Sequence, residues 1–415
     1  MPYLVDVFKS WPMMSSWEEL KSWLTSEAGG LLRVTEPRDS PYAIVRYKNG
    51  VSKFTLAHVP WCRSVIVHKE SRMPVCVSPV KADVITDSSV NDATVAEEFV
   101  DGTMINVFHS ANDESPVVNT RGRLGADKSF YQGGPSFCSM LDEAMVEQGV
   151  STFSNILPVH SSAFHRFTCV VLQHPANRFV KKIDKPGFSI IHQGWVTDDA
   201  SVYIEEDAAV FNYVTSKDTD NSEIQPYNLE AVRAAKTVKD WVSTQAQERG
   251  FVWMGLVLKD GKGRRWRQHS DVYETVHTVR GNESSSEERY SRLRKGRMVD
   301  QYLAFYPEDK QVLYTLEGRL RKNTRQLLHF YVDVFRSRKT LFYELPWPYK
   351  HHVSVLHNYY KNTLRAEGKK MDLTEVVKYV NTLSLEDTTN MLKEHVLDLK
   401  KTPVTDTSVE EVSMA

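Results

Sequence analysis

The chain has 415 residues, of which 41% are hydrophobic and 25% are charged, a composition typical of globular proteins. Its 52 Lys and Arg nearly balance 53 Asp and Glu, so the net charge of -1 favours no class of partner. No stretch approaches eighteen consecutive apolar residues, and the first residues lack a basic segment followed by an apolar run. We therefore expect two or three domains, no membrane partner, no secretion and an intracellular location.

The four cysteines are far apart in the sequence and form no C-x-x-C pair; they are Cys62, Cys76, Cys138 and Cys169. This spacing argues against a structural zinc site and against a disulfide scaffold. Four buried thiols in a reducing compartment are the expectation.

The first 34 residues predict a helical lead. Ser16 and Glu19 form a capping box, and the apolar residues after them repeat at helical spacing until Gly29 and Gly30. Strand patterns follow, and residues 42–48 and 51–57 predict a hairpin around Asn49-Gly50.

The middle of the chain predicts a mostly antiparallel α+β body. Helices are expected at 136–149 and 228–250, and strands at 166–173, 188–196 and 251–258. Beyond about residue 272 the pattern becomes helical, with a capping box at Asp372 and Glu375. The predicted organisation is a lead at 1–34, an α+β domain at 35–272, a helical domain at 273–403 and a flexible tail at 404–415.

Positive charge is concentrated in one segment. Between Lys262 and Thr340, eighteen Lys and Arg face ten Asp and Glu. Such a segment could bind a nucleic-acid backbone, or it could belong to helices whose charged faces are simply solvated. The candidate nucleic-acid-binding residues are Arg264, Arg265, Arg292, Arg294, Lys295 and Arg297.

Several motifs occur in an order that is characteristic of one superfamily. EEFVDGTMINVF at 97–108 is followed by VVNTRGRLG at 117–125, and further motifs lie at 62–82, 167–196, 255–267 and 276–309. Across most of its length the chain resembles the covalent nucleotidyltransferases, specifically the phage RNA ligase 1 family and the ligase-like proteins of large DNA viruses.

The resemblance implies an antiparallel-sheet nucleotidyltransferase domain, like that of RNA and DNA ligases, followed by an all-helical C-terminal domain. In that family a lysine of a Lys-x-Asp-Gly element attacks the α-phosphate of ATP with Mg²⁺ present, forming lysyl-AMP. The residues at the family's nucleotide-binding positions are Asp101, Gly102, Arg121 and Arg267.

The chain departs from the family at its catalytic positions. Phe99 occupies the position of the nucleophilic lysine, and phenylalanine cannot form a phosphoramidate. Val171 and Met254 replace the acidic residues of the third and fourth motifs. The Lys-x-Lys of the fifth motif reads Arg267-Gln268-His269. These replacements predict a protein that keeps the fold but has lost the catalytic groups.

Three hypotheses follow from these departures. The first is a degenerate nucleotidyltransferase that still binds RNA, other nucleic acid or nucleotide and is no longer an enzyme. The second is an active ATP-dependent RNA ligase that uses ATP, Mg²⁺ and a displaced lysine, for which Lys81 is the best candidate. The third is a structural scaffold with a protein partner. A viral origin would place the protein in the host cytoplasm or nucleus, or in the virion.

The remaining candidates each have a structural alternative. Lys128 and Arg121 could hold a phosphate or be exposed loop charges, and His174 with Asn177 and Arg178 more often serves local architecture. Trp253 and Trp266 could stack on bases or belong to the core. No metal site is predicted, because His351, His352 and His357 have no acidic or cysteine partner at ligand spacing.

Overall fold

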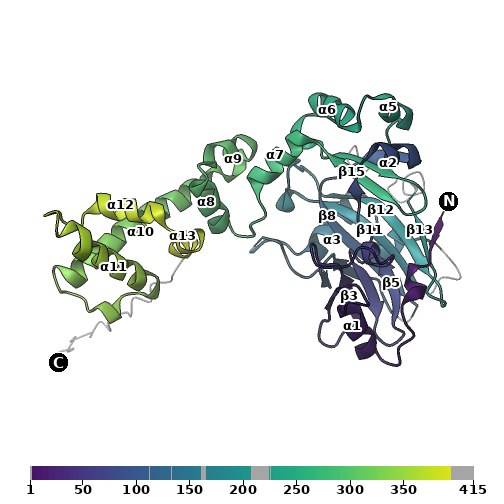
Figure 1. The fold of residues 1–415 in the computed structure, drawn as a ribbon, viewed down its shortest axis with the longest axis horizontal. Coiled ribbons are helices and arrows are strands. Elements are labelled where there is room, and N and C mark those ends of the chain that lie inside the picture. Colours follow the sequence, from purple (N-terminus) through teal and green to yellow (C-terminus); the bar gives the residue numbers. More distant parts are fainter. Residues whose placement is uncertain are drawn as a thin grey trace, which may run out of the picture. The chain divides into compact units, whose positions relative to one another are not determined.

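The computed structural model describes residues 2–111, 113–131, 133–159, 165–206, 224 and 226–393. Its residues form two compact units, 1–281 and 282–415. The first unit contains every described strand and the second is helical, so the chain is α+β with antiparallel sheets and a helical C-terminal region, as the sequence predicts (Figure 1).

The largest sheet of the first unit has seven antiparallel strands in the order β1-β13-β12-β11-β8-β9-β10. Their bounds are β1 Tyr3–Val5, β8 Thr103–Ser110, β9 Val117–Thr120, β10 Arg123–Leu124, β11 His165–Gln173, β12 Gly187–Val196 and β13 Val202–Glu205. The two predicted strands in 166–196 are confirmed as the central pair, β11 and β12, which run side by side over their whole length. Both are almost fully buried, which matches their continuous apolar runs.

A four-stranded sheet in the order β6-β15-β14-β7 carries the motifs of interest. Its strands are β6 Asp83–Val84, β7 Val95–Glu98, β14 Gly255–Lys259 and β15 Arg265–His269. Side chains alternate between its faces. One face buries apolar residues such as Leu256, Leu258 and Trp266 under α6 and its neighbours. The other face, which we call the charged face, carries Glu97, Val257, Lys259, Arg265 and Arg267, as the strand register requires.

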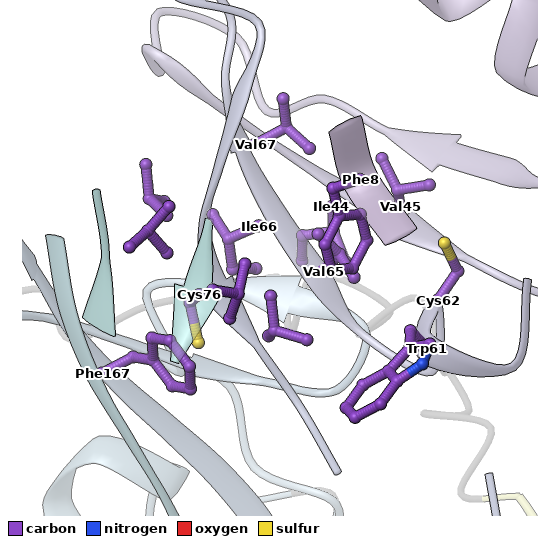
Figure 2. Packing of buried hydrophobic residues seen from close by; sticks show 14 of the residues in the cluster. Phe8, Ile44, Val45, Trp61, Cys62, Val65, Ile66, Val67, Cys76 and Phe167 are labelled. Carbon is purple, nitrogen blue, oxygen red and sulfur yellow. The ribbon is translucent and has the colours of Figure 1, made fainter. Parts of the chain in front are cut away.

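The third sheet, β2-β3-β4-β5, packs on the seven-stranded one. Its strands are β2 Arg33–Thr35, β3 Tyr42–Arg46, β4 Val65–His68 and β5 Met73–Val77. Figure 2 shows the shared core, in which Ile44, Val65, Ile66 and Cys76 lie together with Phe167 of β11. Burial of these side chains is the main force that holds the two sheets together.

The helices of the first unit partly match the prediction. They are α1 Trp17–Thr25, α2 Asp87–Asp92, α3 Phe137–Glu147, α5 Leu229–Ala234, α6 Val238–Arg249 and α7 Asp271–Arg280. The helices expected from the Ser16 capping box and at 136–149 are confirmed. The single helix expected at 228–250 is wrong, because α5 ends at Ala234 and Thr237 then caps a new helix by accepting a hydrogen bond from Asp240 N.

The hairpin expected around Asn49-Gly50 is also wrong. Residues 51–57 form turns rather than a strand, and β3 pairs instead with β2 and β4. The hydroxyl of Ser52 accepts a hydrogen bond from Lys48 N and donates one to Leu31 O. These local bonds satisfy the backbone without a strand, which the Asn-Gly signal alone does not reveal.

The second unit is built around one long helix. Its helices are α8 Ser286–Lys295, α9 Val299–Phe305, α10 Lys310–Phe335, α11 Trp347–Tyr359, α12 Leu373–Thr382 and α13 Leu385–Leu392. The buried side chains of α10 recur at helical spacing and include Leu313, Leu316, Leu320 and Leu327. Asp372 caps α12 by accepting a hydrogen bond from Glu375 N, which confirms the predicted helix start.

Several further expectations can be compared with the structure. The units divide after Gly281, so the boundary expected at 272/273 falls inside α7. Residues 404–415 lie outside the described residues. No described helix is long and apolar enough to cross a membrane. All four cysteines are free; three are buried as expected, whereas Cys138 is partly exposed.

His165, the first residue of β11, gives the fold a specific acid sensitivity. Its ring is buried, and Nδ1 has no hydrogen-bond partner among the described residues. Burial, with a smaller contribution from nearby His68, lowers the pKa of His165 to about 4. The unfolded chain therefore takes up this proton near pH 6.5 and the folded chain only near pH 4, so acidification between these values favours unfolding.

We expect the free energy of unfolding to fall by roughly 2–3 kcal/mol through this group between pH 6.5 and pH 4. Urea denaturation across this range measures the slope. The slope should be shallower in His165→Gln than in the natural chain. A His165→Gln protein with the native slope would contradict the assignment.

Candidate functional site

The segment between β7 and β8 contains Phe99, which the resemblance relates to the position of the nucleophilic lysine. The sheet brings this segment beside the start of β14, since Phe99 N donates a hydrogen bond to Gly255 O at 2.9 Å. The Phe99 ring lies 5.0 Å from the His269 ring, and the guanidinium carbon of Arg267 lies 5.9 Å from the Phe99 ring centroid. Three segments that the resemblance relates to one site are therefore adjacent in space.

His269 contributes little positive charge to this position at neutral pH. Burial, together with the charge of Arg267, lowers the pKa of His269 to about 4. Its Nδ1 contacts the carboxylate of Glu274, while its buried Nε2 has no partner in the described part of the chain. Of Arg267 and His269, which the resemblance relates to the two basic positions of the fifth motif, only Arg267 is therefore positively charged at neutral pH.

Asp101 is committed to bonds within the protein. Its Oδ2 accepts hydrogen bonds from Val180 N at 3.0 Å and Lys181 N at 3.2 Å, and its Oδ1 accepts one from the Tyr273 hydroxyl at 2.8 Å. The carboxylate joins the β7–β8 segment to the loop after β11 and to α7. These three hydrogen bonds give Asp101 a structural role.

Gly102 is placed where a side chain has no room. Its φ is +156°, and an added Cβ would lie 2.5 Å from Leu172 O and 2.7 Å from a methyl carbon of Val171. Val171, which the resemblance relates to a third-motif carboxylate, is buried in the core. This part of the site is packed with apolar groups and provides no metal ligand.

Positive charge gathers close to Arg267. We define the arginine cluster as five side chains that make no ion pair or side-chain hydrogen bond with any described residue: Arg33, Arg46, Arg63, Arg121 and Arg267. Arg33 and Arg46 stand directly opposite each other on β2 and β3, an arrangement that is unfavourable for like charges.

The members of the arginine cluster repel one another. Burial and then the charges of Arg33 and Arg121 lower the pKa of Arg46, whose Nε is buried without a partner among the described residues. Burial and then the charges of Arg265, Arg121 and Arg267 lower the pKa of Arg63 to about 10. Repulsion of this kind costs stability unless an anion compensates it.

Most of the charged face is already neutralised. Lys259 Nζ lies 2.7 Å from Glu97 Oε1, and both side chains are almost fully buried. Arg265 lies between Glu97 and Glu206 at 3.9 and 3.8 Å. Burial raises the pKa of Glu206, but Lys259, His192 and Arg265 together outweigh it and bring that pKa to about 2. These groups form an internal ion network.

Lys81 contacts a carboxylate and an aromatic ring. Its Nζ lies 3.7 Å from Asp83 Oδ1 and 4.9 Å from the centre of the Phe54 ring, and both contacts suit an ammonium group. Its backbone N–H donates to Pro60 O at 3.0 Å. The conformation of Lys81 is thus that of a partly exposed, paired cation.

Two of the basic residues predicted to bind nucleic acid lie in the first unit and are both paired. Arg264 donates to Asp260 at 2.7 Å and to Asp92 at 2.8 Å. Arg265 is buried in the ion network and is 8% exposed. Its burial between Glu97 and Glu206 places it out of reach of an external backbone.

The basic residues of the second unit are partly neutralised as well. Arg292 pairs with Glu283, Arg294 donates to Asn381 at 2.7 Å, and Lys295 donates to Leu383 O at 3.3 Å. Arg297 is exposed and has no ion pair among the residues that the structure describes. The predicted basic face is therefore weaker than the charge count indicates, because Glu283, Asn381 and the carbonyl oxygen of Leu383 engage three of these cations.

The lesser candidates adopt structural roles. His174 accepts a hydrogen bond from Ala176 N and contacts Glu143, while Asn177 donates to Thr103 at 2.8 Å. Trp253 and Trp266 belong to the core, which confirms that alternative. Within the described ranges no group of three or more His, Cys, Asp or Glu could hold a metal ion.

Three members of the arginine cluster, Arg33, Arg46 and Arg63, are absent from the sequence-based site. Arg63 lies within the motif at 62–82, but nothing in a single sequence separates it from a solvated charge. Only the pairing of β2 with β3 brings Arg33 opposite Arg46.

Comparison with known proteins does not identify the chain. No family model matches it, and no curated protein matches its sequence. The structure therefore defines the class alone: an α+β protein with antiparallel sheets and a helical C-terminal region.

Proposed function

We propose that this protein is an RNA-ligase-like nucleotidyltransferase that has lost its catalytic groups and retains the binding of nucleotide or nucleic-acid phosphates. The observation that carries the proposal is the arginine cluster, unpaired within the described residues, beside a phenylalanine at the nucleophile position. Phe99 directly follows β7 and its ring centroid lies 5.9 Å from the guanidinium carbon of Arg267, and the charges of Arg267 and Arg121 both act on Arg63.

The chemistry of the arginine cluster favours a polyphosphate. Guanidinium groups bind phosphate oxygens in pairs, and several at one place suit a triphosphate or the phosphates of an RNA end. A bound polyanion would relieve the repulsion between Arg33 and Arg46 and supply a partner for the buried Nε of Arg46. Relief of this repulsion would add to the free energy of binding.

The loss of catalysis is tested by self-adenylylation. The purified chain is incubated with α-labelled ATP and Mg²⁺ and resolved on a denaturing gel beside Phe99→Lys and Lys81→Ala. We expect no labelled band from the natural chain, because Phe99 offers no nucleophile. A band that disappears in Lys81→Ala would overturn the proposal and support an active RNA ligase with a displaced lysine.

The retained binding is tested with a fluorescent single-stranded RNA that carries a 5′-triphosphate. Replacing Arg121 or Arg267 by alanine should weaken binding about tenfold, because each loses charge-assisted hydrogen bonds. Arg38→Ala is the matched control, since Arg38 is an exposed arginine outside the cluster. Affinity should fall roughly 10- to 100-fold between 50 and 200 mM salt. Absence of binding to RNA and to ATP would favour a scaffold role and contradict the proposal.

A further inference from the structure

The helical unit contains a hollow that the proposed function does not use. It lies between α10 and α12 and has a volume of about 350 Å³, within the range of ligand-binding sites. The side of α10 contributes Glu317, Leu320, Arg321 and Arg325, and α12 contributes Leu373 and Val377, with Arg294 of α8 closing one end.

The floor of the hollow is apolar and uncovered. Leu373 and Val377 lie one turn apart on α12 and are 40% and 41% exposed. They continue the buried stripe of Val376 and Val380, which packs inside the unit. Two adjacent exposed aliphatic side chains that line a hollow favour a ligand with aliphatic groups.

The rim of the hollow carries excess positive charge. Three arginines face a single carboxylate, Glu317, which Arg321 approaches at 2.7 Å and Arg294 at 3.7 Å. Arg325 makes no ion pair or side-chain hydrogen bond with any residue of the described ranges. None of the ten described lining residues is aromatic, so the hollow has nothing on which a base could stack. An acidic, aliphatic peptide fits it better than nucleic acid.

The chain contains a segment with this chemistry. Residues 404–415 include Asp406, Glu410 and Glu411, no Lys or Arg, and three valines. The tether to it starts beside the hollow, because Leu392 O and Met391 O at the end of α13 accept hydrogen bonds from Arg319 and Asn323 of α10. These two residues precede Leu320 and Thr324, which line the hollow. Residues 393–403, when extended, span about 35 Å, which is ample.

We propose that the hollow between α10 and α12 binds residues 404–415 of the same chain. The valines cover Leu373 and Val377, and the carboxylates pair with Arg321 and Arg325. This proposal differs from the flexible tail that composition alone predicts, and it is independent of the phosphate site of the first unit. While residues 404–415 occupy the hollow, no other acidic segment can bind there. When they leave it, another acidic segment can bind.

The test is arginine footprinting of the full chain with phenylglyoxal, read by mass spectrometry at Arg325. Arg338, an exposed arginine away from the hollow, is the internal reference. Neutralising the segment with Asp406→Asn, Glu410→Gln and Glu411→Gln should raise the labelling rate of Arg325 at least about threefold and leave Arg338 unchanged. The matched control, Thr405→Ala with Thr407→Ala and Ser408→Ala, should leave both rates unchanged.

A second measurement tests whether residues 404–415 themselves protect Arg325 from labelling. A labelled peptide with the sequence of residues 404–415 should bind the neutralised full-length protein, and Arg325→Glu should weaken that binding at least about tenfold while Arg338→Glu does not. Equal labelling of Arg325 in the natural and neutralised chains would overturn the proposal. Protection that vanishes on dilution would place the segment of a second copy in the hollow and overturn the assignment to the same chain.

Discussion

Replacing Glu97 by alanine should lower the free energy of unfolding by about 3–5 kcal/mol, the largest loss that we expect from a single substitution in the ion network. Glu97 Oε1 lies 2.7 Å from Lys259 Nζ and 3.9 Å from Arg265 Nη2. Lys259 and Glu97 are 3% and 4% exposed at their side chains. Removal of the carboxylate leaves a buried ammonium group without its partner, and water cannot reach it.

The same network predicts how the loss can be recovered. Glu97→Leu combined with Lys259→Met removes both charges and keeps the volume, so the double variant should be within about 1–2 kcal/mol of the natural chain. Chemical denaturation of the natural chain, Glu97→Leu, Lys259→Met and the double variant measures the coupling energy between the two side chains. A double variant that is as unstable as Glu97→Ala would show that packing at this position, rather than the buried charge, sets the stability.

Replacing Gly102 by alanine should lower the free energy of unfolding by about 3 kcal/mol. Two causes act together at this residue. Its φ of +156° is strained for any residue with a side chain, and the new Cβ would lie 2.5 Å from Leu172 O. Leu172 belongs to the central strand β11, which is paired on both sides and cannot move away.

A matched glycine separates the two causes. Gly149 has a φ of +71°, and a Cβ added there would meet no described atom within 4 Å, so Gly149→Ala should cost only about 1 kcal/mol. Thermal unfolding of both variants measures the difference. Equal costs at the two glycines would show that the contact with β11 is not tight.

The sequence could predict elements whose signal is local. The continuous apolar runs at 166–173 and 188–196 predict buried strands, and Asp372 predicts a helix start, because these features depend on near neighbours alone. The same local reasoning misplaced the hairpin at Asn49-Gly50 and joined α5 to α6. The Ser52 hydroxyl accepts a short-range hydrogen bond from Lys48 N where a strand was expected, and the Thr237 hydroxyl accepts one from Asp240 N that starts a new helix.

In the candidate site, too, some properties follow from the sequence and others only from the tertiary structure. By itself, the sequence determined that Phe99 cannot act as a nucleophile and that Arg267 keeps its charge, because these properties belong to the residue type. Only the tertiary structure decided that Arg265 is buried against Glu97 and Glu206, and that Arg33, Arg46, Arg63 and Arg121 remain unpaired within the described part of the chain. The physical reason is that the energy of a charge depends on the burial and the charges around it, and these are set by strands distant in the sequence.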